Sequence, residues 1–592
     1  MKRIINNNIY MLKFMWKYCK SNVILRLLST LTSPVQPFIF IVSMKLTIDG
    51  IAEKRSLQYL VTVIGLAFLV GTVSTVFTSW VNTSSSAKAK IKISKGIQDE
   101  LLKKAVTLDM SCFDDAEYYD KYVRAMQEAE QRSVEVLDSI VELLSGIIAL
   151  IMILSLIISM NAFVIVICVT MIIINIFLNS VRNKILYKRD MEITRPEREA
   201  EYAKRIFYEP QYAQEIRLGK LGKLMNRKFM LAMDKTLDVI KKYCGKFVFF
   251  DSAFGIMGFC FMSVIMVFAA WQITIGNLSI GSFAALLNGA QQLLEKMFAL
   301  FGQVPKISQN SKYIDNLRLI IESEPQISSE EKGIDVEKVE NSISIKGLSF
   351  TYPGKNIPVL NNININIKNG QKTAIVGYNG VGKSTLVKLI LRFYDPTTGN
   401  ISIGETDYKK ANLNSLRNKF GVVFQNYKCY AMSVYENVIM DDAIDESGEN
   451  KTIEALKYSG IYEKITSFEK GIYTNLSREF DSEGVPLSGG EEQKIAISRA
   501  FVEDKDILIL DEPSSALDPL AEYDINQKIL SLAAEKTVIF ISHRLSTVRM
   551  ADMIYMMDSG EVVESGTHDE LMKLDGKYAE MFRKQAENYV ID

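Results

Sequence analysis

The feature that most constrains this chain is a series of long apolar stretches confined to its first half. A helix needs about 20 mostly apolar residues to cross a bilayer. Six stretches satisfy this requirement, at 23–48, 57–81, 141–159, 162–178, 247–273 and 282–304. The fourth could also be a buried strand, because it is short and rich in β-branched residues, but its lack of charge favours a membrane helix. The sequence therefore predicts a polytopic helical domain over residues 1–322.

The connections between these stretches predict their orientation. Three connections are short and carry few basic residues, at 49–56, 159–161 and 274–281. Two others, 82–140 and 179–246, are long and rich in lysine and arginine, so by the positive-inside tendency they face the cytosol together with both termini. Because the long connections keep a helical alternation of apolar and polar residues, we expect them to extend the membrane helices into the cytosol.

Ionisable residues inside membrane spans are costly and therefore informative. Arg26 and Lys45 lie near the ends of the first span, where we expect their charged groups to reach the interface. Asp251 and Glu295 lie within later spans and are candidates for lining a substrate cavity, with hydrogen bonding between helices as the alternative. The two prolines of the first span predict a kink that a membrane bundle tolerates.

Charge and cysteine content exclude several classes of protein. The chain carries 69 basic and 69 acidic side chains, so no overall field favours nucleic acid as a partner. Its 6 cysteines lie far apart without a C-x-x-C pair, which argues against a zinc site or a disulfide framework. No removable signal peptide is evident after the initial methionine, and we expect the first span to act as the targeting signal.

The second half of the chain has the pattern of a soluble α/β domain. After a polar linker over residues 323–340, strand-like stretches such as KTAIV, GVVF, ILIL and TVIFI alternate with helical ones over residues 341–592. This alternation is typical of a substantially parallel sheet covered by helices.

The strongest motif of this domain is GYNGVGKST at residues 377–385, between a predicted strand and a predicted helix. It matches the phosphate-binding loop G-x-x-x-x-G-K-[ST], in which glycines let backbone N–H groups surround phosphates at a helix N-terminus. Lys383 would neutralise the β- and γ-phosphates of ATP, and the Ser384 hydroxyl would ligate Mg²⁺. The nucleotide-binding candidates in this loop are Gly377, Asn379, Gly380, Gly382, Lys383, Ser384 and Thr385.

A second motif supplies two carboxylates. The apolar run ILIL at 507–510 ends in Asp511 and Glu512, which a buried strand would present at its carboxyl end. Asp511 is suited to hold Mg²⁺ through water, and Glu512 to accept a proton from an attacking water. An apolar run that ends in two acidic residues is weak evidence for a nucleotide site by itself. Together with a phosphate-binding loop in the same domain, it is strong evidence.

The run LSGGEEQ at 487–493 resembles the signature sequence of the ATP-binding cassette (ABC) family. Further elements of that family appear in order along the chain. The resemblance implies that Tyr352 stacks on adenine, Gln425 senses Mg²⁺ and the membrane domain, Asp518 belongs to the intersubunit loop and His543 senses the γ-phosphate. A surface histidine without function is the alternative for His543. Glu491 departs from the family pattern, which more usually has glutamine there.

With six spans before the cassette, the chain resembles an exporter-type (type I) half-transporter. The resemblance implies that two copies pair head to tail, so that Ser488 and Gly490 of one subunit close the ATP bound to the phosphate loop of the other. It also implies coupling helices near 108–118 and 209–220. Because Glu512, His543, Ser488 and Gly490 are all present, a homodimer is favoured over a pair of different chains.

The resemblance implies ATP-driven export across the cytoplasmic membrane, with ATP and Mg²⁺ as cofactors. The segments SREFDSEGVPLSGGEEQKIAISRA and DPLAEYDI are similar to those of exporters of peptides, including modified antimicrobial or signalling peptides, in Gram-positive bacteria. Lipid or amphipathic-drug export is the alternative, followed by a gated channel or regulator. An importer or a soluble ATPase of the same superfamily does not fit the fused spans. We expect no N-terminal peptidase domain, because the first span begins near residue 23.

Overall fold

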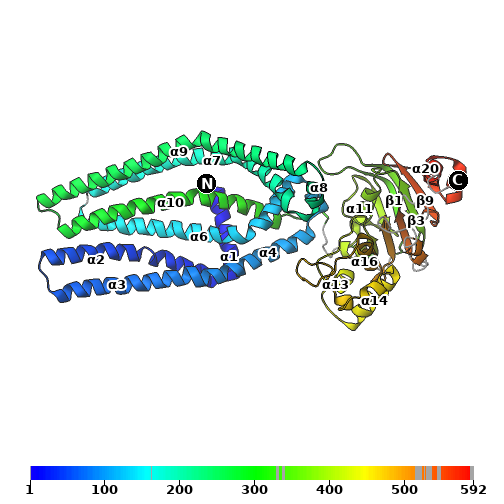
Figure 1. Cartoon of the computed structure of the whole chain (residues 1–592), viewed down its shortest axis with the longest axis horizontal. Coiled ribbons are helices and arrows are strands. Elements are labelled where there is room, and N and C mark those ends of the chain that lie inside the picture. The colour runs from blue at the N-terminus through cyan, green and yellow to red at the C-terminus, as the bar shows by residue number, and fades with distance from the viewer. Residues whose placement is uncertain are drawn as a thin grey trace. The chain divides into compact units, whose positions relative to one another are not determined.

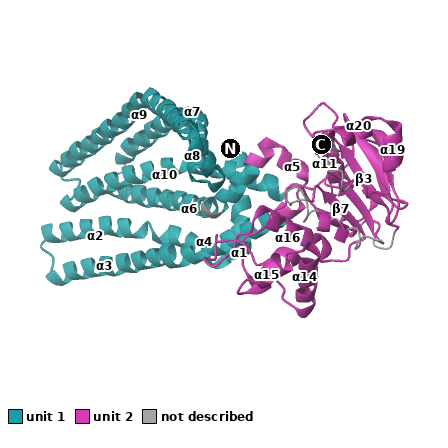
Figure 2. Cartoon of the chain, turned by 45° about the vertical axis from the view of Figure 1, so that its right-hand side comes forward, with its two compact units in different colours: residues 1–103, 121–322 teal, residues 104–120, 323–592 magenta. Residues whose placement is uncertain are grey.

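The computed structural model describes residues 2–586 except 162, 328–332, 337–339, 514–522, 526, 529–535 and 543–547. The chain divides into two compact units, one of residues 1–103 and 121–322 and the other of residues 104–120 and 323–592 (Figure 2). Each unit has its own apolar core, formed between helices in the first and on both sheets in the second.

The first unit consists mainly of long helices (Figure 1). They are α1 (Lys2–Thr32), α2 (Val35–Ala52), α3 (Leu57–Trp80), α4 (Ser86–Thr107), α6 (Ala116–Met160), α7 (Val164–Tyr208), α8 (Ala213–Leu218), α9 (Leu221–Thr274) and α10 (Ile280–Ile321). Within the described residues, 5 segments are long and apolar enough to cross a membrane: Lys2–Ala52, Leu57–Thr107, Arg132–Met160, Val164–Tyr208 and Leu221–Thr274. The sixth expected span lies in α10, which has 42 residues but is less apolar because Gln291, Gln292, Glu295 and Lys296 interrupt it.

The first expected span, 23–48, is divided between two helices. α1 ends at Thr32, and Pro34 is the N-cap of α2. Proline lacks a backbone N–H and its ring collides with the preceding turn, so a helix cannot pass through it undisturbed. Pro37 lies in the first turn of α2, where backbone N–H groups have no helical partner in any case. Instead of the expected kink within one helix, the structure has a break between two helices, α1 and α2, at residues 33–34. The second span, by contrast, continues into α4 through a π-helical turn at Val81–Ser85.

The expected helical extensions are confirmed as continuous with the membrane helices. α6 and α7 have 45 residues each and α9 has 54, which at about 1.5 Å per residue gives lengths of roughly 65–80 Å. α7 and α9 run side by side and are joined by ion pairs, Lys242 to Glu192 at 2.7 Å and Lys235 to Glu199 at 3.0 Å. Between them, a 3-10 turn at Pro210–Tyr212 and the short helix α8 occupy one of the two expected coupling segments.

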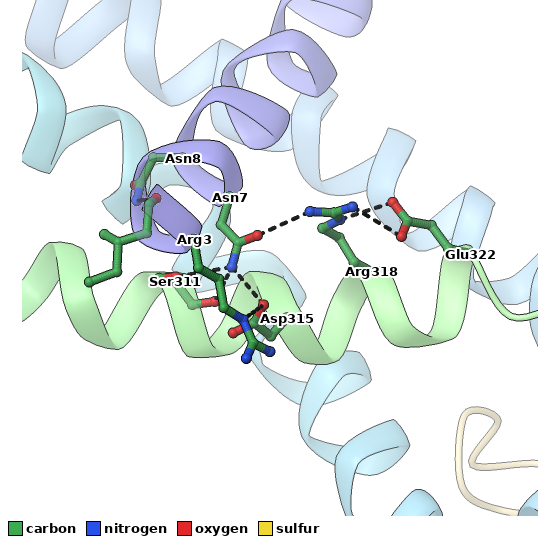
Figure 3. Close-up of polar contacts among 8 residues, drawn as sticks. Arg3, Asn7, Asn8, Ser311, Asp315, Arg318 and Glu322 are labelled. Atoms are coloured by element: carbon green, nitrogen blue, oxygen red, sulfur yellow. Dashed lines mark hydrogen bonds and ion pairs between the residues drawn. The ribbon is translucent and has the colours of Figure 1, made fainter. Parts of the chain in front are cut away.

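The start of α1 is fixed to the last part of α10 by a polar cluster around the buried Asn7 (Figure 3). The Asn7 side chain, 1% exposed, donates to the Ser311 carbonyl at 3.0 Å and to Asp315 at 2.7 Å. Arg318 donates to the Asn7 side-chain oxygen at 3.1 Å, and Arg3 pairs with Asp315 at 3.0 Å. Because each polar group of Asn7 has a partner, the cluster offsets the cost of its burial.

The second unit contains two sheets. β2 (Leu360–Ile367), β1 (Ile343–Phe350), β4 (Thr398–Ile403) and β5 (Thr406–Asp407) form an antiparallel sheet in that order. The larger sheet has the order β10 (Glu561–Gly566), β9 (Met553–Asp558), β3 (Lys372–Gly377), β8 (Thr537–Ile541), β7 (Ile507–Asp511) and β6 (Phe420–Val423). All its neighbouring strands are parallel except β10 and β9. The expected substantially parallel sheet is confirmed, and its apolar runs suit strands covered on both faces.

Helices surround these sheets in the second unit. They are α11 (Lys383–Ile390), α12 (Leu413–Asn418), α13 (Val434–Ile439), α14 (Glu446–Ser459), α15 (Tyr462–Thr466), α16 (Gly489–Phe501), α19 (His568–Leu574) and α20 (Lys577–Ala586). The short helix α5 (Met110–Asp114), which lies in the other expected coupling segment, also belongs to this unit. Just before α5, the Asp109 carboxylate accepts hydrogen bonds from the backbone N–H groups of Gln326 at 2.7 Å and Ile327 at 3.1 Å. Asp109 thus fixes the beginning of the linker to this segment.

Replacing Asn7 by alanine should lower the stability of the protein, because Arg318 and Asp315 would lose partly buried hydrogen bonds. The expected cost is about 1–3 kcal/mol, read as a lower unfolding midpoint of the chain in lipid nanodiscs. The exposed neighbour Asn6 provides the control, Asn6→Ala, which should leave the midpoint unchanged. Equal midpoints for both variants would show that the cluster does not contribute to stability.

Candidate nucleotide site

The phosphate-loop sequence forms the turn between β3 and α11, as the motif requires. Gly382 is the N-cap of α11 with φ of 103°, a left-handed conformation that favours glycine. A Cβ atom at Gly382 would lie 2.5 Å from Leu360 Cδ2, and one at Gly377 would lie 2.3 Å from the Met557 carbonyl oxygen. Both positions therefore require glycine for lack of space, and the loop can bring its backbone N–H groups to face an anion at the start of α11.

The Lys383 side chain lies inside this loop. Its ammonium donates to the carbonyl oxygens of Gly377 at 2.7 Å and Tyr378 at 3.0 Å, and the residue is 7% exposed. Burial lowers the pKa of Lys383, while Glu512 and Asp511 act in the opposite direction. An ammonium in this position is preoriented toward phosphates that the loop would surround.

The two carboxylates of the second motif lie at the carboxyl end of β7. Asp511 is buried, and burial followed by the charge of Glu512 raises its pKa to about 6. A hydrogen bond from Ser384 and the charge of Lys383 partly oppose this rise. Glu512 has φ of 50°, and its backbone N–H donates to the Ile541 carbonyl at 2.9 Å, which ties it to β8. The turn places the Glu512 side chain beside Gln425, whose amide donates to its carboxylate at 2.8 Å.

These side chains fit a divalent cation shared with a ligand. Ser384 and Asp511 bring a hydroxyl and a carboxylate together, and the raised pKa of Asp511 shows that a positive charge there would be favourable. In the described part of the chain, no group of three or more His, Cys, Asp or Glu residues could hold a metal. A Mg²⁺ ion would therefore need phosphate oxygens and water to complete its shell, as Mg²⁺ commonly does.

Tyr352 lies near the phosphate loop. Its hydroxyl is 3.1 Å from the Thr385 hydroxyl in the first turn of α11, and its ring packs edge-on against Tyr394 with centroids 5.4 Å apart. The Tyr394 hydroxyl in turn donates to the Asp114 carboxylate at the end of α5. A continuous set of contacts, Asp114 to Tyr394 to Tyr352 to Thr385, therefore joins the segment 104–120 to the phosphate loop within the second unit.

The signature run forms the N-terminus of α16. Ser488 is the N-cap and makes a capping box with Glu491: the Ser488 backbone N–H donates to the Glu491 carboxylate at 2.9 Å, and its side chain accepts from the Glu491 N–H. These bonds lower the pKa of Glu491 and place an anion at the positive end of the helix. Among the described hydrogen bonds, Ser488 and Gly490 make none to the phosphate loop of the same chain.

The remaining candidate residues of the sequence analysis are not part of the contacts described so far. His543 and Asp518 lie outside the described residues. Asp251 forms an ion pair with Arg182 at 3.3 Å and lines a cavity of about 530 Å³. Glu295 is exposed and accepts a hydrogen bond from Gln291 within α10 at 3.3 Å.

Arg26, for which the sequence predicts a position at the interface, is paired inside the helical unit. Arg26 pairs with Asp138 of α6 and donates to Asn82, and it lines a cavity inside the helical unit. Its side chain is only 11% exposed, since partners from two other segments surround it. The sequence signal that could have identified it is the pair of acidic residues at the start of the third span, Asp138 and Glu142.

Comparison with known proteins identifies the family. The model of the ABC transporter transmembrane region matches residues 21–193, and the ABC transporter model matches residues 360–515. Together the two matches extend over more than half of the chain. The chain belongs to the ABC transporter family. With its membrane region ahead of a single ATP-binding domain, this ABC transporter has the organisation of an exporter-type half-transporter.

Several relatives of this ABC transporter are transporters by name. Subtilin transport ATP-binding protein SpaT of Bacillus subtilis is 28% identical over 557 residues, which cover 92% of this chain and 88% of SpaT. ABC multidrug transporter atrD of Emericella nidulans is 36% identical over 306 residues, 51% of this chain and 22% of atrD. The chain thus spans less than a quarter of atrD. The structure of a bacterial Atm1-family ABC exporter with ATP bound has the same fold, with TM-score 0.80 at 21% identity over 96% of this chain and 98% of that chain.

Replacing Tyr394 by phenylalanine should loosen the segment that contains α5, because Asp114 loses its hydroxyl partner while the ring packing stays. A hydrogen bond to a charged group contributes about 1.5–3 kcal/mol, so amide exchange within 104–120 should accelerate by roughly 10- to 100-fold. Hydrogen–deuterium exchange followed by mass spectrometry measures this.

The control for this variant is Tyr408→Phe. The Tyr408 hydroxyl is buried with no hydrogen-bond partner among the described residues, so its loss should leave the exchange of segment 104–120 unchanged. Identical exchange in the two variants would contradict a role for Tyr394 in holding the segment.

Proposed function

We propose that this ABC transporter exports a peptide across the cell membrane, powered by ATP hydrolysis, as a dimer of two identical chains. The observation that carries the proposal is the presence, in one chain, of membrane-length helices and of a folded phosphate loop facing two carboxylates. The long connections rich in lysine and arginine support an orientation with the ATP-binding unit and both termini in the cytosol.

In the proposed ATP site, the phosphates lie on the loop N–H groups at the N-terminus of α11, with Lys383 beside the β- and γ-oxygens. Ser384 and Asp511 would hold Mg²⁺, which would supply positive charge to neutralise the phosphates. Glu512, oriented by Gln425, accepts a proton from the attacking water. Tyr352 contacts the adenine, while the roles of His543 and Asp518 rest on the resemblance of their sequence positions.

The position of the signature helix supports the proposed dimer. Ser488 and Gly490 lie at the N-terminus of α16, and their described hydrogen bonds leave the phosphate loop of their own chain untouched. A helix N-terminus stabilises negative charge, so Ser488 of the partner subunit would favour the γ-phosphate bound to this chain. ATP would then stabilise the closed dimer by binding it better than the open one.

A peptide substrate is the first choice, and a lipid or amphipathic drug is the second. The similarity to SpaT, named for subtilin transport, extends over nearly the whole chain and includes the membrane region. The similarity to atrD, named for multidrug transport, extends over about half of the chain. Since the membrane region contacts the substrate in an exporter, the longer match favours the peptide.

Replacing Glu512 by glutamine should reduce ATP hydrolysis by at least about 100-fold, because an amide cannot accept the proton that a general base removes. ATP binding should persist, since Lys383 and the loop are unchanged. Phosphate release and nucleotide binding in proteoliposomes measure the two effects, with Glu503→Gln as the control at an exposed carboxylate of the same unit.

The parent chain in inverted vesicles should accumulate peptide only with ATP, and the Glu512 variant should not. Hydrolysis by the variant at the parent rate would contradict the assignment of the base. Hydrolysis by the parent without movement of any peptide, lipid or drug would instead support a channel or a regulator.

A further inference from the structure

The start of the signature helix α16 is open to a ligand but already holds an anion of its own chain. Ser488 and Gly489 are exposed there, and a Cβ atom at Gly489 would meet no other atom within 4 Å. The first backbone N–H groups of a helix have no partner within the helix, so this end attracts negative charge. A phosphate could therefore approach Ser488 without displacing a neighbouring segment.

The anion at this end is the Glu491 carboxylate. It accepts a hydrogen bond from the Ser488 backbone N–H at 2.9 Å, and the Ser488 hydroxyl is also hydrogen-bonded to it. An N–H and a hydroxyl are the two donors that a serine can offer to a phosphate. Glu491 and a γ-phosphate would therefore compete for the same two groups of Ser488.

Glu491 has a second partner nearby, the Lys464 side chain of α15. The Lys464 ammonium lies 3.6 Å from the Glu491 carboxylate, and both side chains are partly exposed. Exposed ion pairs contribute little to stability, so this pair alone does not fix the position of Glu491. Lys464 can keep the carboxylate paired when Ser488 turns to another anion.

The charge of Glu491 is not required to cap the helix. Glu491 occupies the third helical position of a capping box, and a capping box accepts glutamine as well as glutamate at that position. Glutamine, which the family pattern more usually has here, would keep the bond to the Ser488 N–H without a negative charge. The charge of Glu491 therefore acts mainly on an anion that approaches Ser488, by repulsion and by competition for its donors.

We propose that Glu491 limits the ATP affinity of the dimer by competing with the γ-phosphate for Ser488, and that Lys464 receives the carboxylate when the two subunits close on ATP. This inference rests on the proposed function, since that γ-phosphate is bound to the phosphate loop of the partner subunit. ADP has no γ-phosphate to displace Glu491 from Ser488. Glu491 therefore weakens the binding of ATP and leaves that of ADP unaffected.

The test compares the two nucleotides in lipid nanodiscs that hold two copies of the full chain. Phosphate release gives the KM for ATP and the inhibition constant of ADP. Both constants are measured for the parent, Glu491→Gln, Lys464→Gln and the chain with both changes. The matched control is Glu492→Gln, which removes the same charge from the same turn of α16. Among the described hydrogen bonds and ion pairs, the Glu492 carboxylate makes none.

The KM for ATP should fall at least about tenfold in Glu491→Gln, because two like charges side by side are strongly unfavourable. The inhibition constant of ADP should not change, and Glu492→Gln should leave both constants near those of the parent. Lys464→Gln should raise the KM for ATP in the parent and have no effect once Glu491 is glutamine, since an uncharged amide needs no cation.

Three results would overturn the inference. The first is an unchanged KM for ATP in Glu491→Gln. The second is an equal fall in the inhibition constant of ADP, which would indicate a general change of the fold. The third is an equal effect of Glu492→Gln, which would assign the change to net charge alone.

Failure of the proposed function gives a different result. Nanodiscs that hold a single copy should not hydrolyse ATP, because a complete site needs two chains. If single copies hydrolyse ATP at the parent rate, the dimer is wrong whatever the variants do. If hydrolysis needs two copies but all variants share one KM for ATP, the dimer stands and the role of Glu491 is wrong.

Discussion

The nucleotide site depends on opposite charges held near one another: the Lys383 ammonium inside a glycine loop, and the carboxylates of Asp511 and Glu512 at the end of β7. Buried charges are costly in a protein interior, and here the pKa of Lys383 is lowered and that of Asp511 raised by burial. Glycine at positions where a Cβ atom would collide keeps the ammonium and the loop N–H groups close together. The site is therefore prepared for a ligand that brings phosphates and a cation at once.

The same unit contains a continuous set of contacts from this site to the segment 104–120, where the sequence predicts a coupling helix. Thr385 follows Ser384 in the loop, and its hydroxyl meets Tyr352, which packs on Tyr394, which donates to Asp114. Asp109, the residue directly before α5, holds the beginning of the linker through the backbone N–H groups of Gln326 and Ile327. A change of loop conformation on binding nucleotide would therefore act on both ends of the segment through packed contacts rather than at a distance.

The sequence alone predicts the features that depend on local pattern. The phosphate loop, the strand ending in Asp511, the parallel sheet and the long helices follow from periodicity and motif spacing. Features made by distant partners could not be predicted. Arg26 lies at the end of an apolar run, and only its tertiary neighbour, 112 residues away, places it in a cavity. In the sequence, Asn7 is one of several polar residues near the N-terminus, and only its contacts with α10 distinguish it. α10 is less apolar than the other expected spans, because four polar residues within 291–296 lie between its apolar ends.

The central claim is that ATP is held between two copies of this chain, with Ser488 of the partner subunit over the loop that contains Lys383. A chain without its 6 native cysteines, carrying Asn379→Cys and Ser488→Cys, tests this directly with a short thiol cross-linker. The account predicts a covalent dimer that forms with ATP and is absent from either single-cysteine chain. A chain that stays monomeric with ATP, or that cross-links only within itself, would contradict it.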